Sequence, residues 1–331
     1  MIAASPEPAA TFGFCQVSDI EQSFIRVTEI WVPSPDKSRL EFGGGLYGER
    51  KDFEAVSRKM TFAFDEGLPG KAWAQRHPVV LKDFRSSYFL RTDAALAAGL
   101  TCGIAIPMFS GYGIKAVLVL LCSANEENSG AIEVWTNDPA RSTHLAFSDG
   151  YFGASDGFEA VAQGMAFAKG EGLPGLVWEQ GLPVLMENLR RRSQFVRWKE
   201  ARKWGLSRGL GLPCSYEPGR TWVTTLLSGQ ETPIARRFEV WLPVNGGLNF
   251  HSGMCDANRS YALDYQAKWI GQGEGFIGKT LQLGVPSVVA NFLAEPKWLR
   301  VSTQLAGLSA GIAMPVFDYR GNTIAVVSWY V

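Results

Sequence analysis

The sequence predicts an α+β protein made of three tandem domains, each with an antiparallel sheet of five or six strands and helices on one face. The 331 residues, 46% of them hydrophobic, suffice for two or three domains with packed cores. A phrase of helical length occurs three times, and short alternating strands recur around it in the same order. Its copies read EGLPGKAWAQRHPVVLKDF at 66–84, EGLPGLVWEQGLPVLMENL at 171–189 and EGFIGKTLQLGVPSVVANF at 274–292.

Two further segments recur in register with this phrase and set the length of one unit. EIWVPSP, EVWTNDP and EVWLPVN begin at residues 29, 133 and 239, and GLTCGIAIPMF, GLSRGLGLPCS and GLSAGIAMPVF follow the phrase. The period of about 105 residues is too long for a solenoid repeat and matches a small domain. We therefore predict unit 1 at 1–122, unit 2 at 123–227 and unit 3 at 228–331. Unit 3 diverges most, since it lacks the Leu-Pro pair and the tryptophan of the phrase.

Within each unit the order of elements is the same. The alternating segment at 29–32 and the turn after it predict a β-hairpin. The phrase predicts a short helix, because Pro174 suits a first helical turn and Gly181 suits the helix end. The glutamate ahead of each helix lies where the helix dipole favours negative charge, at Glu66, Glu171 and Glu274. In unit 1 the later elements are a strand at 79–81, a helical segment around Arg91 and strands at 103–109 and 116–122. Residues 11–27 read equally well as a helix or as an extra strand.

This order of signals resembles the GAF domain family across nearly the whole chain, three times over. The pattern runs EVW, GEGLPGxVW, GxPV, an Asp or Asn before Phe or Leu, FxR, AGL, and a closing GxAxPxF with an apolar strand. The resemblance implies a six-stranded antiparallel sheet flanked by helices, with a small-molecule pocket on one side and a helical dimerisation surface on the other. Typical members are sensory or regulatory modules, so a small metabolite, a homodimer or a signalling partner is implied.

The linkers depart from the family pattern. Only SANEENSGAI at 123–132 and SGQETPIARR at 228–237 separate the units. Ten residues of helix reach only about 15 Å, which leaves no room for the long signalling helices of the family. We therefore expect the units to pack closely, with adjoining sheets as one arrangement.

Composition excludes several classes of protein. Lysine plus arginine equal aspartate plus glutamate at 32 each, so no net charge draws the chain to nucleic acid or to a membrane surface. The five cysteines are odd in number and form no CxxC pair, which argues against disulfides and zinc: Cys15, Cys102, Cys122, Cys214 and Cys255. The N-terminus lacks a signal-peptide pattern, and no apolar run reaches membrane-spanning length. We expect a soluble, cytoplasmic protein.

Comparison of the units provides a test for catalytic residues, because a shared catalytic residue should recur. His77 aligns with Leu182 and Val285, and Cys102 aligns with Arg208 and Ala310. Neither a histidine triad nor a metal cluster follows from these positions. The phosphate-binding, cyclic-nucleotide and bilin-attachment patterns are not recognisable either. We expect no enzyme activity, no metal and no cofactor, with a reactive thiol at Cys102 as the remaining enzymatic alternative.

One stretch of unit 2 is strongly basic. RRRSQFVRWKEARKW at 190–204 has seven basic residues, one acid and two tryptophans, and the aligned stretches of units 1 and 3 are not similarly basic. A solvated helix face with its aromatic residues toward the core is the plainer interpretation. The alternative is a docking site for an anionic partner.

Polar residues that recur in all three units mark the candidate site. Strand alternation places each glutamate of the EVW segment on one face with the tryptophan two residues later. An arginine recurs in the later helical segment, and we predict that it meets the glutamate at the edge of each pocket, either as a structural ion pair or as a ligand-binding group. The expected pairs are Glu29 with Arg91, Glu133 with Arg197 and Glu239 with Arg300.

Five further residues complete the candidate site. An acid or amide after the phrase is expected to supply a further polar contact, from Asp83, Asn188 or Asn291. Trp73 and Trp178 are expected to pack into the core, with a stacking wall of the ligand pocket as the competing interpretation.

Three functions follow from this reading. The first is a non-catalytic sensory or regulatory protein that binds a small metabolite. The second is a protein-interaction scaffold with filled pockets, and the third is a thiol-dependent enzyme.

Overall fold

The computed structural model describes residues 23–123, 129–153, 155–193, 195–214, 219–229, 231–258 and 260–331. Cys15 lies outside these ranges, as does most of the stretch at 11–27 that reads as helix or strand. The last three residues of that stretch belong to the first strand, β1 (Ile25–Pro33).

Unit 1 contains one six-stranded antiparallel sheet. Its strands follow β1 as β2 (Arg39–Leu46), β3 (Thr61–Ala63), β4 (Val79–Leu81), β5 (Cys102–Ser110) and β6 (Gly113–Cys122), in the spatial order β3-β2-β1-β6-β5-β4. Three helices lie on one face: α2 (Lys51–Ser57), α3 (Gly67–Gln75) and α4 (Thr92–Ala97). The hairpin, the helix of the phrase and the later strands are where the sequence predicts them.

Units 2 and 3 repeat this sheet with the same relative order of strands. Unit 2 has β7 (Gly130–Asn137), β8 (Leu145–Tyr151), β9 (Ala166–Phe167), β10 (Val184–Met186), β11 (Leu206–Pro213) and β12 (Thr221–Gly229), with helices α5 (Asp156–Gln163), α6 (Gly172–Gln180) and α7 (Trp198–Lys203). Unit 3 has β13 (Arg237–Val244), β14 (Gly247–Cys255), β15 (Trp269–Gly271), β16 (Ser287–Val289), β17 (Gly311–Phe317) and β18 (Thr323–Tyr330), with helices α8 (Tyr261–Tyr265), α9 (Gly275–Leu283) and α10 (Lys297–Leu305). The predicted α+β class is confirmed.

The recurring phrase fixes how α3, α6 and α9 approach the sheet. In unit 2 a Cβ on Gly175 would lie 2.2 Å from the carbonyl oxygen of Ala168, so only glycine allows this close approach. Gly70 and Gly278 have the same contact with the preceding strand, at 2.2 and 2.3 Å. The glutamate before each helix serves the same junction, since Glu171 accepts the backbone N–H of Ala168 at 3.2 Å. It makes no capping hydrogen bond to its own helix, and its interaction with the helix dipole stays a prediction.

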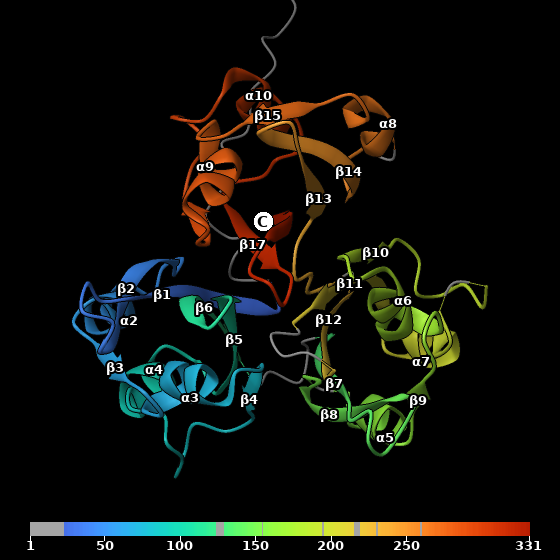
Figure 1. The fold of residues 1–331 in the computed structure, drawn as a ribbon, viewed down its shortest axis with the longest axis horizontal. Coiled ribbons are helices and arrows are strands. Elements are labelled where there is room, and N and C mark those ends of the chain that lie inside the picture. Colours follow the sequence, from blue (N-terminus) through green and yellow to red (C-terminus); the bar gives the residue numbers. More distant parts are fainter. Residues whose placement is uncertain are drawn as a thin grey trace, which may run out of the picture.

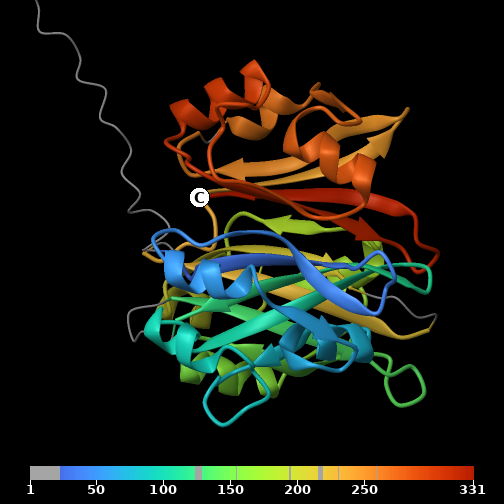
Figure 2. The ribbon, with the colours of Figure 1, turned by 90° about the vertical axis from the view of Figure 1, so that its left-hand side faces the viewer.

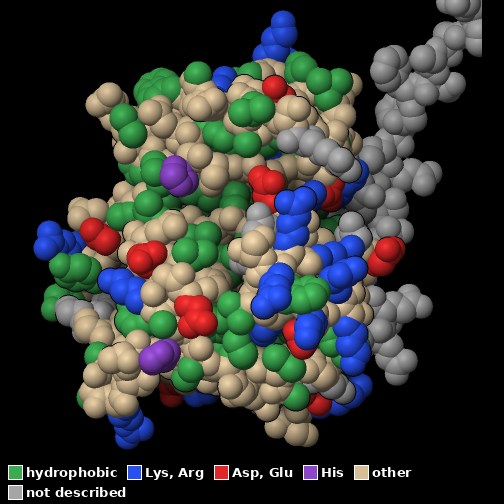
Figure 3. All heavy atoms as spheres, turned by 90° about the vertical axis from the view of Figure 1, so that its right-hand side faces the viewer, with side chains coloured by type: hydrophobic (Ala, Val, Ile, Leu, Met, Phe, Trp, Pro, Cys, Tyr) green, Lys and Arg blue, Asp and Glu red, His purple; other side chains and the backbone are tan. Residues whose placement is uncertain are grey.

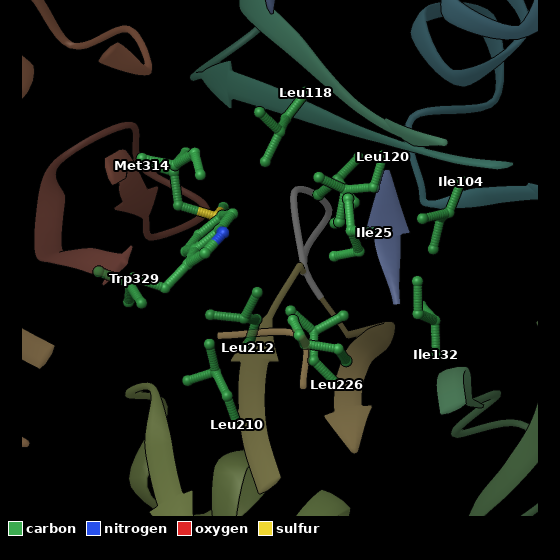
Figure 4. Packing of buried hydrophobic residues seen from close by; sticks show 14 of the residues in the cluster. Ile25, Ile104, Leu118, Leu120, Ile132, Leu210, Leu212, Leu226, Met314 and Trp329 are labelled. Carbon is green, nitrogen blue, oxygen red and sulfur yellow. The ribbon is translucent and has the colours of Figure 1, made fainter. Parts of the chain in front are cut away.

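The three units surround a common centre, with their helices outside and their sheets inside (Figure 1). In Figure 2 the helices of unit 3 lie at the top and its strands face the other two units. The inward faces of all three sheets form one hydrophobic cluster, which includes Leu118, Leu212, Met314 and Trp329 (Figure 4). The predicted close packing of the units through adjoining sheets is confirmed.

Each pair of units is also linked by polar contacts at the rim of this central cluster. Lys82 of unit 1 forms ion pairs with Asp149 and Glu159 of unit 2, at 3.2 and 2.8 Å. Ser110 of unit 1 donates to the carbonyl of Gly321 in unit 3 at 2.8 Å. Arg208 of unit 2 forms an ion pair with Asp256 of unit 3.

Of the helices in the described ranges, none combines the length and the apolar character needed to cross a bilayer.

Candidate functional site: three buried carboxylates and the clefts between units

A glutamate lies fully buried on the first strand of every sheet. Glu29, Glu133 and Glu239 are each 0% exposed. In each unit the tryptophan two residues later lies on the same face and donates its indole N–H to the carboxylate, at 3.1, 3.1 and 2.9 Å. The predicted pairing of glutamate with tryptophan on one strand face is therefore correct in all three units.

In unit 1 the buried carboxylate is held by Arg91. Its two terminal nitrogens donate to the two oxygens of Glu29 at 2.5 and 2.8 Å, and Tyr47 donates its hydroxyl at 2.9 Å. Burial alone would raise the pKa of Glu29. The positive charge of Arg91 and the hydrogen bonds from Arg91, Ser57 and Tyr47 nevertheless hold it below the ordinary value of 4.5. Glu29 is therefore ionised at neutral pH.

Unit 2 repeats this arrangement. Arg197 donates to both oxygens of Glu133 at 2.5 and 2.8 Å, and Thr225 donates its hydroxyl at 2.8 Å. The side chains of Arg197 and Glu133 are 2% and 0% exposed. The predicted pairs of units 1 and 2 are thus present, but in the interior of each unit and not at the edge of a pocket.

In unit 3 the predicted pair of Glu239 with Arg300 is wrong. Arg300 is exposed and donates only to the carbonyl of Leu293, at 3.4 Å. The reason is helical register. Arg91 and Arg197 each lie eight residues before the glycine that follows their helix, whereas the residue eight before Gly307 is Leu299, which is buried.

A different arginine supplies the positive charge in unit 3. Arg237 lies on β13 two residues before Glu239, is 1% exposed, and places a terminal nitrogen 3.9 Å from the carboxylate. The hydroxyls of Ser328 and Tyr330 donate to Glu239 at 2.7 Å each, and Tyr261 donates as well. Burial and the charge of Glu239 raise the pKa of both tyrosines well above 10, so both keep the protons that they donate. Strand alternation from Glu239 to Arg237 was the sequence signal for this cation.

Aromatic rings enclose the ion pairs. The guanidinium of Arg91 lies 4.9 Å from the ring centre of Phe53 and 5.3 Å from that of Trp31, and Arg197 lies 4.4 Å from that of Phe158. These rings belong to the apolar clusters between sheet and helices. We call each glutamate with its tryptophan and arginine the carboxylate cluster of its unit. In units 1 and 2 it lies in the core between the sheet and the helices.

The predicted acid or amide after the phrase does not reach the carboxylate cluster. Each of these side chains instead accepts the backbone N–H two residues later, at 2.8 Å for Asp83, 3.0 Å for Asn188 and 3.2 Å for Asn291. This is the hydrogen bond of an Asx turn, so the three residues shape the loop after the short strand.

The predicted burial of two tryptophans is only partly correct. Trp73 and Trp178 are half-buried at the margins of their cores. They follow Leu68 and Leu173 by five residues, about 140° around a helix, whereas the buried Ala72 and Val177 follow by four. Trp178 lines a cleft of about 570 Å³ between units 2 and 3, opposite Phe317 and Tyr319. We call this the Trp178 cleft.

A second cleft between units 2 and 3 is larger and more polar. It measures about 700 Å³, and we call it the Arg191 cleft. Unit 2 contributes the loop after β10 and the ends of β11 and β12, including Asn188, Arg191 and Arg208. Unit 3 contributes the end of β14 and α8, including Asp256 and Tyr261. The sequence could not reveal either cleft, because each depends on how two units pack.

The basic stretch at 190–204 contains two sets of basic side chains: some bind partners inside unit 2, and others are exposed to solvent. Arg197 belongs to the carboxylate cluster, and Arg190 donates to the carbonyls of Leu206 and Gly205 at 3.2 and 3.1 Å. Trp198 and Trp204 are half-buried, as expected of a helix that faces the core on one side. Five basic side chains are exposed: Arg191, Arg192, Lys199, Arg202 and Lys203. Figure 3 shows Lys and Arg side chains gathered on the side of the molecule that carries unit 2.

Histidine and cysteine contacts are structural in character. His77 of unit 1 stacks on Trp222 of unit 2 with ring centres 4.0 Å apart, an inter-unit contact that the sequence did not indicate. The four described cysteines are buried and free, and burial raises the pKa of Cys214 to about 11. Cys102 lies opposite Cys122 in the sheet, and its pKa, which burial would raise, is lowered by hydrogen bonds from Cys122, Tyr151 and Thr101. Among the described residues no group of histidine, cysteine and acidic side chains could hold a metal.

Comparison with known proteins gives matches among solved structures. No family model and no curated protein matches the sequence. The chain is similar to an A. Aeolicus nlh2 GAF domain (18% identity, TM-score 0.25, 30% of this chain and 58% of that one) and to a GAF domain/HD domain protein from Geobacter sulfurreducens (20%, 0.26, 30% and 64%). It is also similar to a free methionine-R-sulfoxide reductase from Neisseria meningitidis (16%, 0.24, 30% and 52%). The chain thus spans between half and two thirds of these three structures.

The architecture of each unit is the one that the GAF resemblance implies. Each has a six-stranded antiparallel sheet with helices on its outer face. We therefore describe the chain as three tandem GAF-like units.

Proposed function

We propose that this chain is a non-catalytic regulatory protein that binds its ligand in the clefts between its GAF-like units. The observation that supports this proposal is the carboxylate cluster in the interior of each unit. A metabolite at the position of a carboxylate cluster, between the sheet and the helices, would have to displace a buried ion pair, and leaving one charge of such a pair uncompensated destabilises a protein by about 3–5 kcal/mol. The clefts between units 2 and 3 require no such displacement.

The absence of enzyme activity is part of the same proposal. The recurring glutamates are held by arginines in units 1 and 2 and by serine and tyrosine hydroxyls in unit 3, and all three carboxylates are shielded from solvent. The described thiols are buried, which opposes access by a substrate. A cytoplasmic location fits these free thiols, and we include it in the proposal.

A protein-interaction scaffold is the second candidate function. It is favoured by large apolar side chains that unit 3 leaves exposed, with Leu263, Leu293 and Leu305 at 75%, 78% and 83%. A signalling partner or a second copy of the chain could cover such residues.

A thermal-shift screen of metabolites separates the two functions. A ligand at a hundred times its dissociation constant should stabilise the fold by about 2.7 kcal/mol. The shift should be lost in a cleft variant, Trp178→Ala or Arg191→Gln, and kept in the interior variant Thr225→Val, which removes one hydroxyl from Glu133. Loss of the shift in Thr225→Val alone would place the ligand inside unit 2. No shift with any compound would contradict ligand binding and leave the scaffold function.

A further inference from the structure

The walls of the Arg191 cleft come from two units and differ in character. Arg190, Arg191 and Arg208 line it from unit 2, and Asp256, Asn258 and Ala262 are among the residues that line it from unit 3. A molecule in the cleft would therefore meet mainly basic side chains on one side and a mixed wall of polar and small apolar residues on the other. This combination suits a metabolite with an anionic group and a less polar body.

The charge of the cleft is positive despite its acidic residues. Three arginines face two acids, Glu187 and Asp256. The exposed basic residues of α7 lie in the same stretch of chain and add to the positive field on this side of unit 2. Such a field raises the local concentration of anions and speeds their association.

The two arginines most able to bind an anion differ in what they contact. Arg191 is exposed, and among the described residues its guanidinium forms no hydrogen bond or ion pair. Arg208 is held by Asp256 across the unit boundary, with the two side chains 22% and 42% exposed. Burial raises the pKa of Asp256 even though Arg208 and Arg236 favour its charged form.

From this arrangement we infer that the Arg191 cleft binds a small phosphorylated metabolite, with its phosphate against the guanidinium groups of Arg191 and Arg208. The planar fork of arginine matches the oxygens of a phosphate, and a dianion offers enough acceptors for two such groups. The rest of the ligand lies against the unit 3 wall, which includes Asn258 and Ala262. This inference rests on the proposed function and adds the site and the chemical class of the ligand.

Isothermal titration calorimetry of the full chain with pyrophosphate tests the inference, with citrate as a carboxylate of comparable charge. Pyrophosphate should bind with one site per chain. Arg191→Gln should weaken binding about tenfold or more, because a charged hydrogen-bonding group is lost. The control is Lys199→Gln, which removes one exposed charge from the same basic stretch outside the cleft and should change affinity less than about twofold.

A second variant tests the role of Arg208 from the opposite direction. Asp256→Asn releases Arg208 and removes a negative charge from the cleft, so pyrophosphate should bind several-fold more tightly. Unchanged affinity in this variant would contradict the role of Arg208.

Three results of the titration would overturn the inference. Equal weakening in Arg191→Gln and Lys199→Gln would mean diffuse attraction to the basic stretch, and citrate binding without pyrophosphate binding would contradict the phosphate class. Absence of binding by both anions would exclude the cleft as an anion site. A screened metabolite that still binds at the Trp178 cleft would leave the proposed function standing, so the two proposals fail separately.

Discussion

The three buried glutamates are neutralised by arginines from different elements. In units 1 and 2 the arginine precedes the helix that covers the sheet, and in unit 3 it comes from the same strand as the glutamate. Each unit places an arginine near its glutamate because an ionised carboxylate is costly to bury unpaired in an apolar interior. The carboxylate cluster thus requires a positive charge near the buried glutamate, and this charge can come from different positions in the sequence.

At the scale of single residues, Arg197→Ala should destabilise the protein by about 3–5 kcal/mol, because it leaves Glu133 buried without its cation. Arg300→Ala is the matched control, since Arg300 is exposed, and should change stability by less than about 0.5 kcal/mol. Urea unfolding of both variants measures the difference. Equal effects of the two substitutions would contradict the assignment of Arg300 to the surface and of Arg197 to the interior.

The pH dependence of stability provides a second test in unit 1. Because folding lowers the pKa of Glu29, the pair with Arg91 contributes its full stability above the ordinary pKa of 4.5 and loses it as the pH falls through the folded value. Glu29→Gln lacks this titration. The difference in unfolding free energy between the natural protein and Glu29→Gln should therefore be largest near neutral pH and shrink below about pH 4.5. A difference that stays constant with pH would mean that Glu29 does not titrate as proposed.

At the scale of elements, the recurring phrase is explained by the junction between strand and helix. Gly175 allows α6 to approach the carbonyl of Ala168, and Glu171 binds the N–H of the same residue. The three copies share this junction, which explains why the phrase recurs.

Gly175→Ala should destabilise the fold by about 2 kcal/mol or more, since its methyl group would meet backbone that cannot move freely. Gly164→Ala serves as the control, because the nearest atom to its Cβ lies 3.7 Å away. Thermal denaturation of both variants gives the comparison. A Gly175→Ala protein as stable as the control would show that the close approach is not required.

Strands and helices were largely predictable from the sequence, whereas several side-chain positions were not. Hairpins, the phrase helix and the strand at 79–81 follow from local pattern, which needs no knowledge of packing. Arg300 was misplaced because one residue of helical register turns a side chain by about 100°. Trp178 was misplaced for the same reason. It follows the buried Leu173 by five residues, whereas a spacing of four would have placed it on the same helix face. The clefts lie beyond local pattern altogether, because residues from distant segments form them.

At the scale of the whole molecule, one central cluster joins the three units. Leu118 of unit 1 is 0% exposed and belongs to the cluster that also contains Met314 and Trp329 of unit 3 (Figure 4). Each sheet is complete within its unit, yet among the described residues its inward face is covered by the other two units.

Leu118→Ala should therefore lower the stability of the whole chain by about 2–5 kcal/mol while unfolding remains a single transition. Differential scanning calorimetry measures this. A scan that splits into separate transitions, with only one of them shifted, would mean that the units unfold independently.

The central claim is that the interior of each unit is filled and that binding takes place between units. Nuclear magnetic resonance of the protein with ¹⁵N-labelled tryptophan tests it most directly, because Trp31, Trp135 and Trp241 donate their indole N–H to the buried carboxylates. We predict that these three signals exchange slowly with solvent and do not move when a ligand from the metabolite screen is added. A ligand of the Trp178 cleft should instead move the signal of Trp178. Ligand-induced shifts of the three buried indoles, with Trp178 and the residues of the Arg191 cleft unaffected, would contradict the account.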